Sequence, residues 1–161
     1  MYELKCSQVI PLPRHEVFAF FSDIHNLERI TPPWLHFKIL TPQPCELAPG
    51  SLIDYRLKLY GIPFHWQTCI DQFEPDNYFA DTQRRGPYRH WYHEHHFSDV
   101  PEGTLIEDHV HYRLWGGPLA WPLHGLFIKR SLNKIFTFRR SMIASLLTPE
   151  ASSITPPGDH E

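Results

Sequence analysis

Residues 122–147, near the end of the chain, place apolar side chains at helical spacing. The apolar positions are Ile128, Leu132, Ile135, Phe136, Met142, Ile143 and Leu146. At about 100° per residue these side chains gather on one face of a helix, opposite a basic face. The basic residues are Lys129, Arg130, Lys134 and Arg140. The pattern predicts a long amphipathic helix that covers a partner surface.

Arg139 interrupts this apolar face, because it lies four positions after Ile135 and four before Ile143. A guanidinium is always charged in a protein and is costly to bury alone. We therefore expect Arg139 to reach water at the edge of the helix or to meet an acceptor on the surface that the helix covers.

Most of the chain before this helix alternates between apolar and polar residues with a period of two, which is typical of β-strands. Turns rich in Pro, Gly, Asp and Asn separate the alternating segments. The expected strands are residues 2–10, 37–40, 52–60, 64–73, 78–84, 88–98 and 104–114. Strands joined by such short turns predict an antiparallel meander.

Two short helices are expected after the first strand, over residues 13–22 and 24–30. Pro13 suits a first helical position and Asp23 suits a cap, and we expect a kinked pair rather than a cover. The order of elements predicts an α+β fold, in which a curved antiparallel sheet of about seven strands wraps around the C-terminal helix. We expect one domain over residues 1–148 and a disordered tail over residues 149–161.

The composition argues against several classes of function. The 161 residues carry a formal charge of −3, and the 15 Lys and Arg are spread out, which argues against nucleic-acid binding. No apolar run approaches the roughly 18 residues of a membrane span, and no leader segment is evident, so we expect a cytoplasmic protein without stable membrane insertion. The cysteines Cys6, Cys45 and Cys69 are odd in number and suggest neither a disulfide framework nor a thiolate metal site.

The strand over residues 88–98 carries the candidate chemistry. Side chains at i and i+2 share a face, so His93 and His95 point the same way as Trp91, toward the interior. By the same argument Asp108 points inward from the last strand. Asp81 and Gln83 are expected to point inward from residues 78–84. Antiparallel pairing would then bring Asp108 near the two histidines, with Arg139 above them.

These residues admit three roles. An imidazole beside a carboxylate suits general acid/base chemistry, with His93, His95 and Asp108 as the catalytic candidates. Alternatively, the buried groups form a structural cluster in which each neutralises another. Thirdly, they grip the polar end of an apolar ligand. Histidines at alternate positions can chelate a metal, but the spacing is a weak signal, and we expect no metal and no cofactor.

The chain resembles the START-like superfamily, also called the SRPBCC or helix-grip group, which includes polyketide cyclase/dehydrase-like proteins. The resemblance covers about residues 1–147. The segments that carry it are residues 11–18, 22–27, 79–88, 91–97 and 104–112. It implies the helix-grip fold and a carrier of hydrophobic ligands, a cyclase or hydrolase, or a partner-binding module, because the fold alone does not decide function.

We therefore expect a small hydrophobic or aromatic ligand to bind between the sheet and the C-terminal helix. The expected ligand-binding residues are Tyr55, Trp66, Asp81, Gln83, Trp91, His93, His95, Asp108, Tyr112 and Arg139. The alternatives are a cyclase- or hydrolase-like enzyme, and an interaction module that uses Trp115 and Trp121. The sequence leaves the ligand and the oligomeric state open.

Overall fold

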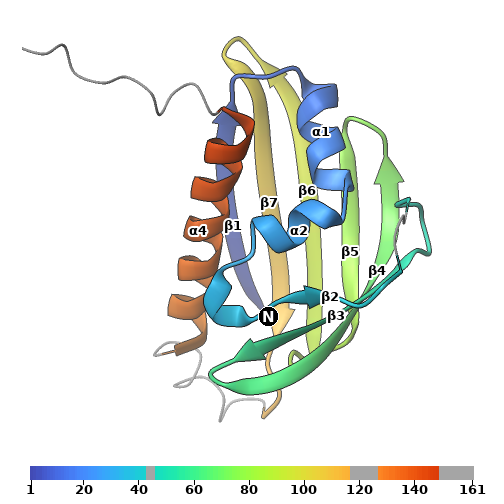
Figure 1. Ribbon diagram of the computed structural model, residues 1–161, viewed down its shortest axis with the longest axis vertical. Helices are drawn as coiled ribbons and strands as arrows, with labels where there is room; N and C mark the ends of the chain where they lie inside the picture. The colour runs from blue at the N-terminus through green and yellow to red at the C-terminus, as the bar shows by residue number, and fades with distance from the viewer. Residues whose placement is uncertain (43–45, 117–126, 149–161) are drawn as a thin grey trace, which may run out of the picture.

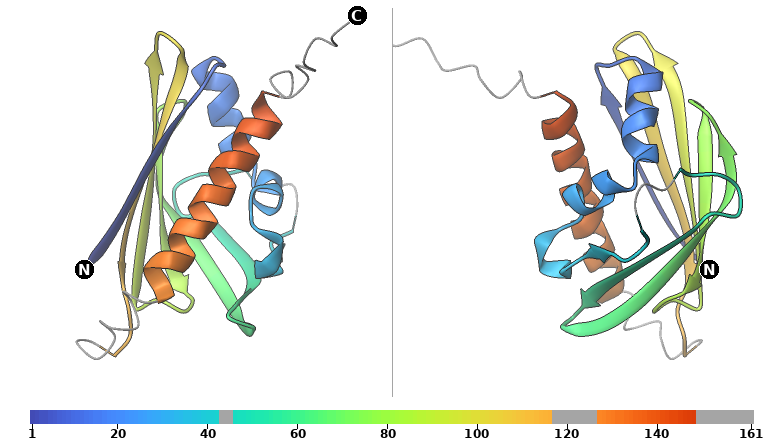
Figure 2. Two further views of the ribbon diagram at one scale, coloured as in Figure 1. Left: turned by 90° about the vertical axis from the view of Figure 1, so that its left-hand side faces the viewer. Right: turned by 45° about the vertical axis from the view of Figure 1, so that its right-hand side comes forward.

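The computed structural model describes residues 1–42, 46–116 and 127–148. A seven-stranded antiparallel sheet curves around a long helix, in the strand order β1-β7-β6-β5-β4-β3-β2 (Figures 1 and 2). The strands are β1 Tyr2–Ile10, β2 Lys38–Ile39, β3 Leu52–Leu59, β4 Ile62–Glu74, β5 Tyr78–Arg85, β6 His90–Val100 and β7 Gly103–Arg113. The expected curved meander is confirmed.

Helix α4, Lys129–Leu147, lies on the concave face of the sheet, with α1, Arg14–Ser22, and α2, His25–Arg29, beside it on the same face (Figure 2). The apolar stripe of α4 meets the sheet through Leu132, Phe136 and Ile143, which are all buried. Trp121, residues 122–126 of the expected helix and the expected tail over residues 149–161 lie outside the described residues. In the described part of the chain, no helix is long and apolar enough to cross a membrane.

The core has two large clusters, one toward each end of α4. One packs Leu132 and Phe136 against residues of β1, β3, β4, β6 and β7. The other packs Ile143 against β1, β5, β6, β7 and α1, with Val17 and Phe18 at its centre. The helices and the sheet therefore bury apolar surface toward both ends of α4.

Two local details differ from the expected elements. A 3₁₀ turn, η1 over Pro33–Leu35, follows α2, and its Trp34 ring contacts Phe138 and Lys134 on α4. Strand β4 begins at Ile62, because the two-residue turn Tyr60-Gly61 has positive φ at both residues and lets Leu59 pair with Ile62. The turn is one residue shorter than the connection over residues 61–63 that the expected strands leave.

Gly103 provides a test of how closely β1 and β7 approach. Its φ is +133°, and a Cβ there would overlap the carbonyl oxygen of Ile10. We expect Gly103→Ala to lower the free energy of unfolding by about 2–4 kcal/mol in urea titrations. Gly50→Ala is the control, because Gly50 also has positive φ but a Cβ there would meet nothing within 4 Å. Its expected loss is about 1 kcal/mol, and equal losses for the two variants would contradict this account.

Candidate functional site

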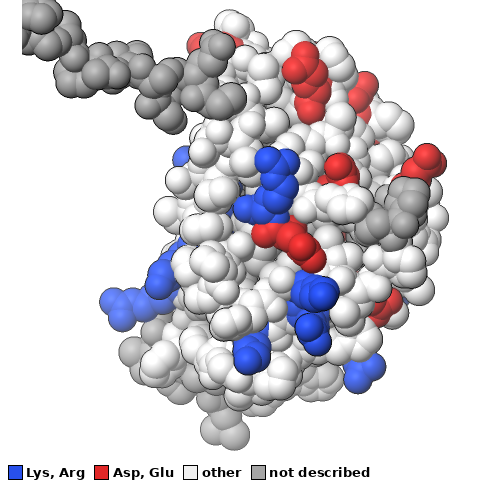
Figure 3. Space-filling view, in the orientation of Figure 1, with Lys and Arg blue, Asp and Glu red and all other residues white. Residues whose placement is uncertain are grey.

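A cavity of about 170 Å³ lies between the concave face of the sheet, α4 and the two short helices. Its walls are mainly apolar. The apolar and aromatic lining residues include Phe21, Leu27, Ile30, Phe37, Tyr55, Leu57, Trp66, Phe79, Tyr88, Trp91, Leu132, Ile135 and Phe136. Figure 3 shows that the described part of the face bearing α1, α2 and α4 intersperses acidic and basic side chains among uncharged ones.

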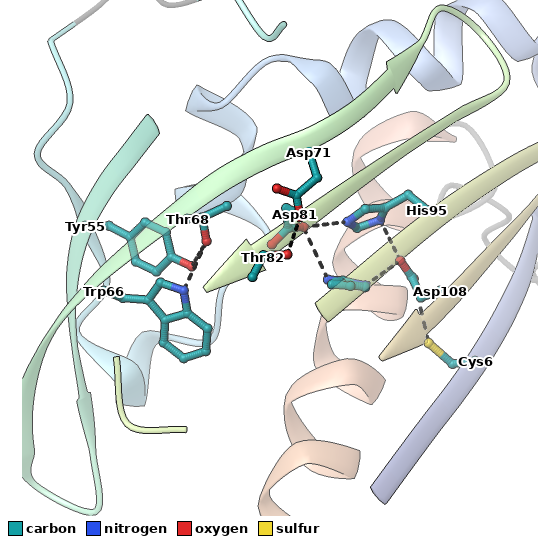
Figure 4. Close-up of polar contacts among 10 residues, drawn as sticks. Cys6, Tyr55, Trp66, Thr68, Asp71, Asp81, Thr82, His95 and Asp108 are labelled. Carbon is teal, nitrogen blue, oxygen red and sulfur yellow. Dashed lines mark hydrogen bonds and ion pairs between the residues drawn. The ribbon is translucent and has the colours of Figure 1, made fainter. Parts of the chain in front are cut away.

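Aromatic side chains from β3, β4 and β6 form one wall of the cavity. The rings of Tyr55 and Trp66 stack with centroids 5.8 Å apart, and Trp91 meets the Trp66 ring edge-on at 5.4 Å. Trp66 Nε1 donates a hydrogen bond of 3.0 Å to the Thr68 hydroxyl, which also contacts the Tyr55 hydroxyl at 3.3 Å (Figure 4). Because their polar atoms are satisfied locally, these rings present apolar faces to a ligand.

Asp81, His93, His95 and Asp108 form a polar cluster on the inward face of the sheet (Figure 4). Strand register creates it, since Asp81 pairs with His93 between β5 and β6, and His95 pairs with Asp108 between β6 and β7. The two imidazoles lie 3.9 Å apart between the two carboxylates. Their side chains are only 6% and 5% exposed, so solvent does little to screen the charges.

Each imidazole contacts both carboxylates. His93 Nε2 lies 3.1 Å from Asp108 Oδ1, and its Nδ1 lies 3.9 Å from Asp81 Oδ2. His95 Nδ1 lies 2.7 Å from Asp108 Oδ1, and its Nε2 lies 3.6 Å from Asp81 Oδ2. The contact of His95 Nδ1 is close but poorly directed, because this buried atom has no hydrogen bond of good geometry within the described residues.

The surroundings within the cluster shift the pKa values of its members in different directions. Burial raises the pKa of Asp108, but its contacts with the His93 and His95 imidazoles outweigh burial and hold that pKa well below its ordinary value. Burial and the neighbouring His95 lower the pKa of His93. Burial also acts to lower the pKa of His95, yet its contacts with Asp108 and Asp81 leave it raised. Asp108 is therefore ionised at neutral pH, and His95 is the imidazole that takes a proton first.

Cys6 extends the cluster and was not singled out as a site residue from the sequence. It pairs with Asp108 between β1 and β7, and its Sγ contacts Asp108 Oδ2 at 3.7 Å. Burial, followed by the charge of Asp108, raises the pKa of the thiol to about 12, so it stays protonated and donates to the carboxylate. Leu4 and Cys6 lie two residues apart and so share one face of β1, but only the register of β1 against β7 joins Cys6 to Asp108.

Arg139 lines the cavity from α4, at the position where the sequence placed it within the apolar stripe. Its guanidinium carbon lies 5.5 Å from the centroid of the Phe136 ring. Within the described residues the structure gives this guanidinium no hydrogen bond or ion pair. Arg139 is therefore a cation beside the cavity whose hydrogen-bond donors are available to a bound molecule.

The structure brings most of the expected ligand-binding residues to the cavity and leaves three away from its surface. The residues that line it are Tyr55, Trp66, Asp81, Trp91, His93, His95 and Arg139. Gln83 instead binds the backbone of Tyr88 at the β5–β6 turn, with Nε2 donating at 2.7 Å. Asp108 contacts the histidine rings without lining the cavity, and Tyr112 is only 1% exposed within the core.

Helices α1 and α2 supply a wall that we did not anticipate. Phe21, Leu27 and Ile30 line the cavity, so the pair covers part of the concave face in addition to forming a kink. An apolar face was visible in each short helix, but helices of 9 and 5 residues carry little information on which surface they cover. Their position depends on the chain path after β1.

Two groups among the described residues have donor atoms close enough to hold a metal ion. One is Asp81, His93 and His95 in the cavity, and the other is Glu94, His96 and His109 on the opposite face of the sheet. In each group all three donor atoms lie within 4.8 Å of one another. The sequence suggested chelation by His93 and His95 only as a weak pattern.

Comparison with known proteins agrees with the fold. Residues 10–137 match the family model described as "Polyketide cyclase / dehydrase and lipid transport". The match spans most of the chain. The chain belongs to this family. No curated protein matches it.

Solved structures similar to this polyketide cyclase / dehydrase family member share its fold at low sequence identity. The TTHA0849 protein from Thermus thermophilus is 15% identical with a TM-score of 0.70, over 94% of this chain and 100% of that chain. Ara h 8.0201 is 16% identical with a TM-score of 0.62, over 89% and 98%. The di-domain ARO/CYC StfQ from the steffimycin biosynthetic pathway is 10% identical with a TM-score of 0.70, over 92% and 51%. These confirm the helix-grip fold expected from the sequence.

Asp108→Asn tests the energetics of the polar cluster. The change removes the charge that stabilises two buried imidazoles, so we expect the free energy of unfolding at neutral pH to fall by about 3–5 kcal/mol. Glu107→Gln makes the equivalent change on the same strand but on the opposite face, and we expect it to cost less than about 0.5 kcal/mol. Urea unfolding of both variants measures the difference, and similar losses would show that the cluster does not depend on the Asp108 charge.

Proposed function

We propose that this chain binds a small hydrophobic or aromatic molecule in the cavity between the sheet and α4, as a carrier or sensor. The observation that carries the proposal is the cavity itself, with an aromatic wall on one side and a few charged groups on the other. Apolar pockets with a few convergent polar groups are the usual form of small-molecule sites. The family description, which joins polyketide chemistry to lipid transport, supports the same class of ligand.

The geometry suggests an orientation for the ligand. Its apolar body would lie against Tyr55, Trp66 and Trp91, where flat rings can stack. Its polar end would point to the wall that carries His95 and Arg139. A volume of about 170 Å³ is close to the roughly 150 Å³ that admits a benzene-sized molecule, so a compact ligand suits it better than a long lipid chain.

Filling the cavity tests where the ligand binds. Ile135 is half-buried and lines the cavity from α4, so we expect Ile135→Trp to weaken the binding of naphthol at least about tenfold by occupying its space. Thr137→Trp adds the same ring to an exposed position of the same helix and should leave binding unchanged. Isothermal titration calorimetry gives the affinity, while thermal unfolding confirms that both variants fold. Equal affinity for the two variants would place the ligand elsewhere.

Arg139 tests the polar end of the ligand. With its donors available in the cavity wall, it should prefer an anionic group, so Arg139→Met is expected to weaken naphthoic acid binding about tenfold or more. Naphthol, which is neutral at pH 7, should lose much less. Arg140→Met removes an equal charge from an exposed position on the same helix and serves as the control. A uniform loss for both ligands would argue against a charge-specific contact.

A catalytic role is the second candidate, as a cyclase- or hydrolase-like enzyme. The specific observation in its favour is that His93 and His95 line the cavity while both contact Asp108. With a co-purified or screened ligand in hand, incubation followed by mass spectrometry would detect turnover. His95→Gln should abolish turnover if this imidazole acts as the acid or base, and should leave a pure carrier able to bind. Cytoplasmic location and the absence of nucleic-acid binding stay predictions.

A further inference from the structure

We propose that Asp81, His93 and His95 form a binding site for one first-row divalent metal ion of the Zn²⁺ type, with its open positions facing the cavity. The proposal goes beyond binding of an organic ligand and does not depend on it. The sequence led us to expect no metal, because histidines at alternate strand positions are a weak signal without knowledge of their partners.

Three donor atoms converge on one point. Asp81 Oδ2 lies 3.9 Å from His93 Nδ1 and 3.6 Å from His95 Nε2. Metal–ligand bonds of about 2.0–2.2 Å place neighbouring donor atoms about 3–3.5 Å apart, depending on the geometry. All three donor atoms lie within 4.8 Å of one another, so the side chains would close around an ion with shifts of about an ångström.

Asp108 contacts the ring nitrogens of His93 and His95 that point away from Asp81. Metal-binding histidines usually give their other ring N–H to a carboxylate, which fixes the tautomer and the orientation of the ring. Here both outer nitrogens lie near one carboxylate oxygen. His93 Nε2 is within hydrogen-bond distance of Asp108 Oδ1 at 3.1 Å, and His95 Nδ1 makes a closer but poorly directed contact with it at 2.7 Å. Protons on these nitrogens leave the lone pairs of His93 Nδ1 and His95 Nε2 directed toward Asp81.

The two carboxylates differ in their position relative to the cavity. Asp81, His93 and His95 line the cavity, whereas Asp108 does not. An ion held by the first three would have open coordination positions on the cavity side, where a ligand oxygen or a water molecule can bind. Two imidazoles and one carboxylate suit Zn²⁺, Fe²⁺ or Co²⁺ better than Mg²⁺ or Ca²⁺, which prefer oxygen donors.

The second histidine group is a weaker candidate and provides a control. On the outer face Glu94 already accepts a hydrogen bond of 3.1 Å from the Tyr78 hydroxyl, and its other oxygen lies 3.6 Å from His111 Nε2. The rings of His96 and His109 lie 5.3 Å apart. His109→Gln removes a donor from this group and touches nothing in the cavity, so of the two groups among the described residues only the inner one keeps all three donors.

The experiment is a Co²⁺ titration of chelator-treated protein carrying His109→Gln, followed by visible absorption. We expect one Co²⁺ per chain, with ligand-field bands of a site of low coordination number, and displacement of Co²⁺ by Zn²⁺. Adding Asp81→Asn to this background should weaken Co²⁺ binding by about a hundredfold or more. Absence of stoichiometric binding, or an affinity unchanged by Asp81→Asn, would overturn the proposal.

A second measurement needs no cavity variant and covers the case in which Asp81→Asn does not fold. Long-range ¹H–¹⁵N spectra of the native chain with Zn²⁺ identify the imidazole nitrogens that bind the ion. We expect His93 Nδ1 and His95 Nε2 to be metal-bound, and His93 Nε2 and His95 Nδ1 to stay protonated. Coordination only by outer-face histidines would overturn the proposal. The titration contains no organic ligand, so its failure and a failure of naphthol binding are separate results.

Discussion

Two carboxylates and two imidazoles lie on the inward face of a curved sheet. The register of the strands that carry them depends on keeping these buried groups paired. Charges with so little exposure must be paired, because an isolated one would cost several kcal/mol. Pairing requires β5, β6 and β7 to keep one register, in which Asp81 meets His93 and Asp108 meets His95. A slip of one residue in any of these strands would send that strand's members of the cluster to the outer face. The cluster therefore favours a single sheet arrangement at the position where the cavity needs polar groups.

The cavity exists because the helices meet the sheet at two separate clusters. Phe136 and Ile143 on α4 belong to different clusters, and the concave face between them is wide enough that side chains do not fill it. Aromatic residues form one wall of the space that is left, and the polar atoms of Tyr55 and Trp66 both contact the Thr68 hydroxyl. The faces of these rings are therefore free to pack against a bound molecule.

The polar wall of the cavity, which carries His95 and Arg139, is common to all the proposed roles. Carrier, enzyme and metal site would all use the same few groups, with Arg139 on the helix and His95 on the sheet bordering one cavity. What distinguishes these roles is the positive charge near Asp81, which a protonated imidazole or a bound ion can supply. A metal would also change the ligand, since an open coordination position favours a molecule with an oxygen donor at one end.

The element order, the faces of the strands and the position of Arg139 in the apolar stripe of α4 could be predicted from the sequence alone. Periods of two and of about 3.6 residues depend only on local backbone geometry, so they can be read from the chain. Three features could be known only from the folded structure. Cys6 contacts Asp108, Gln83 donates a hydrogen bond to the Tyr88 backbone at the β5–β6 turn, and α1 and α2 line the cavity. These depend on strand register and sheet curvature, which arise from contacts between residues far apart in the chain and leave no local periodicity.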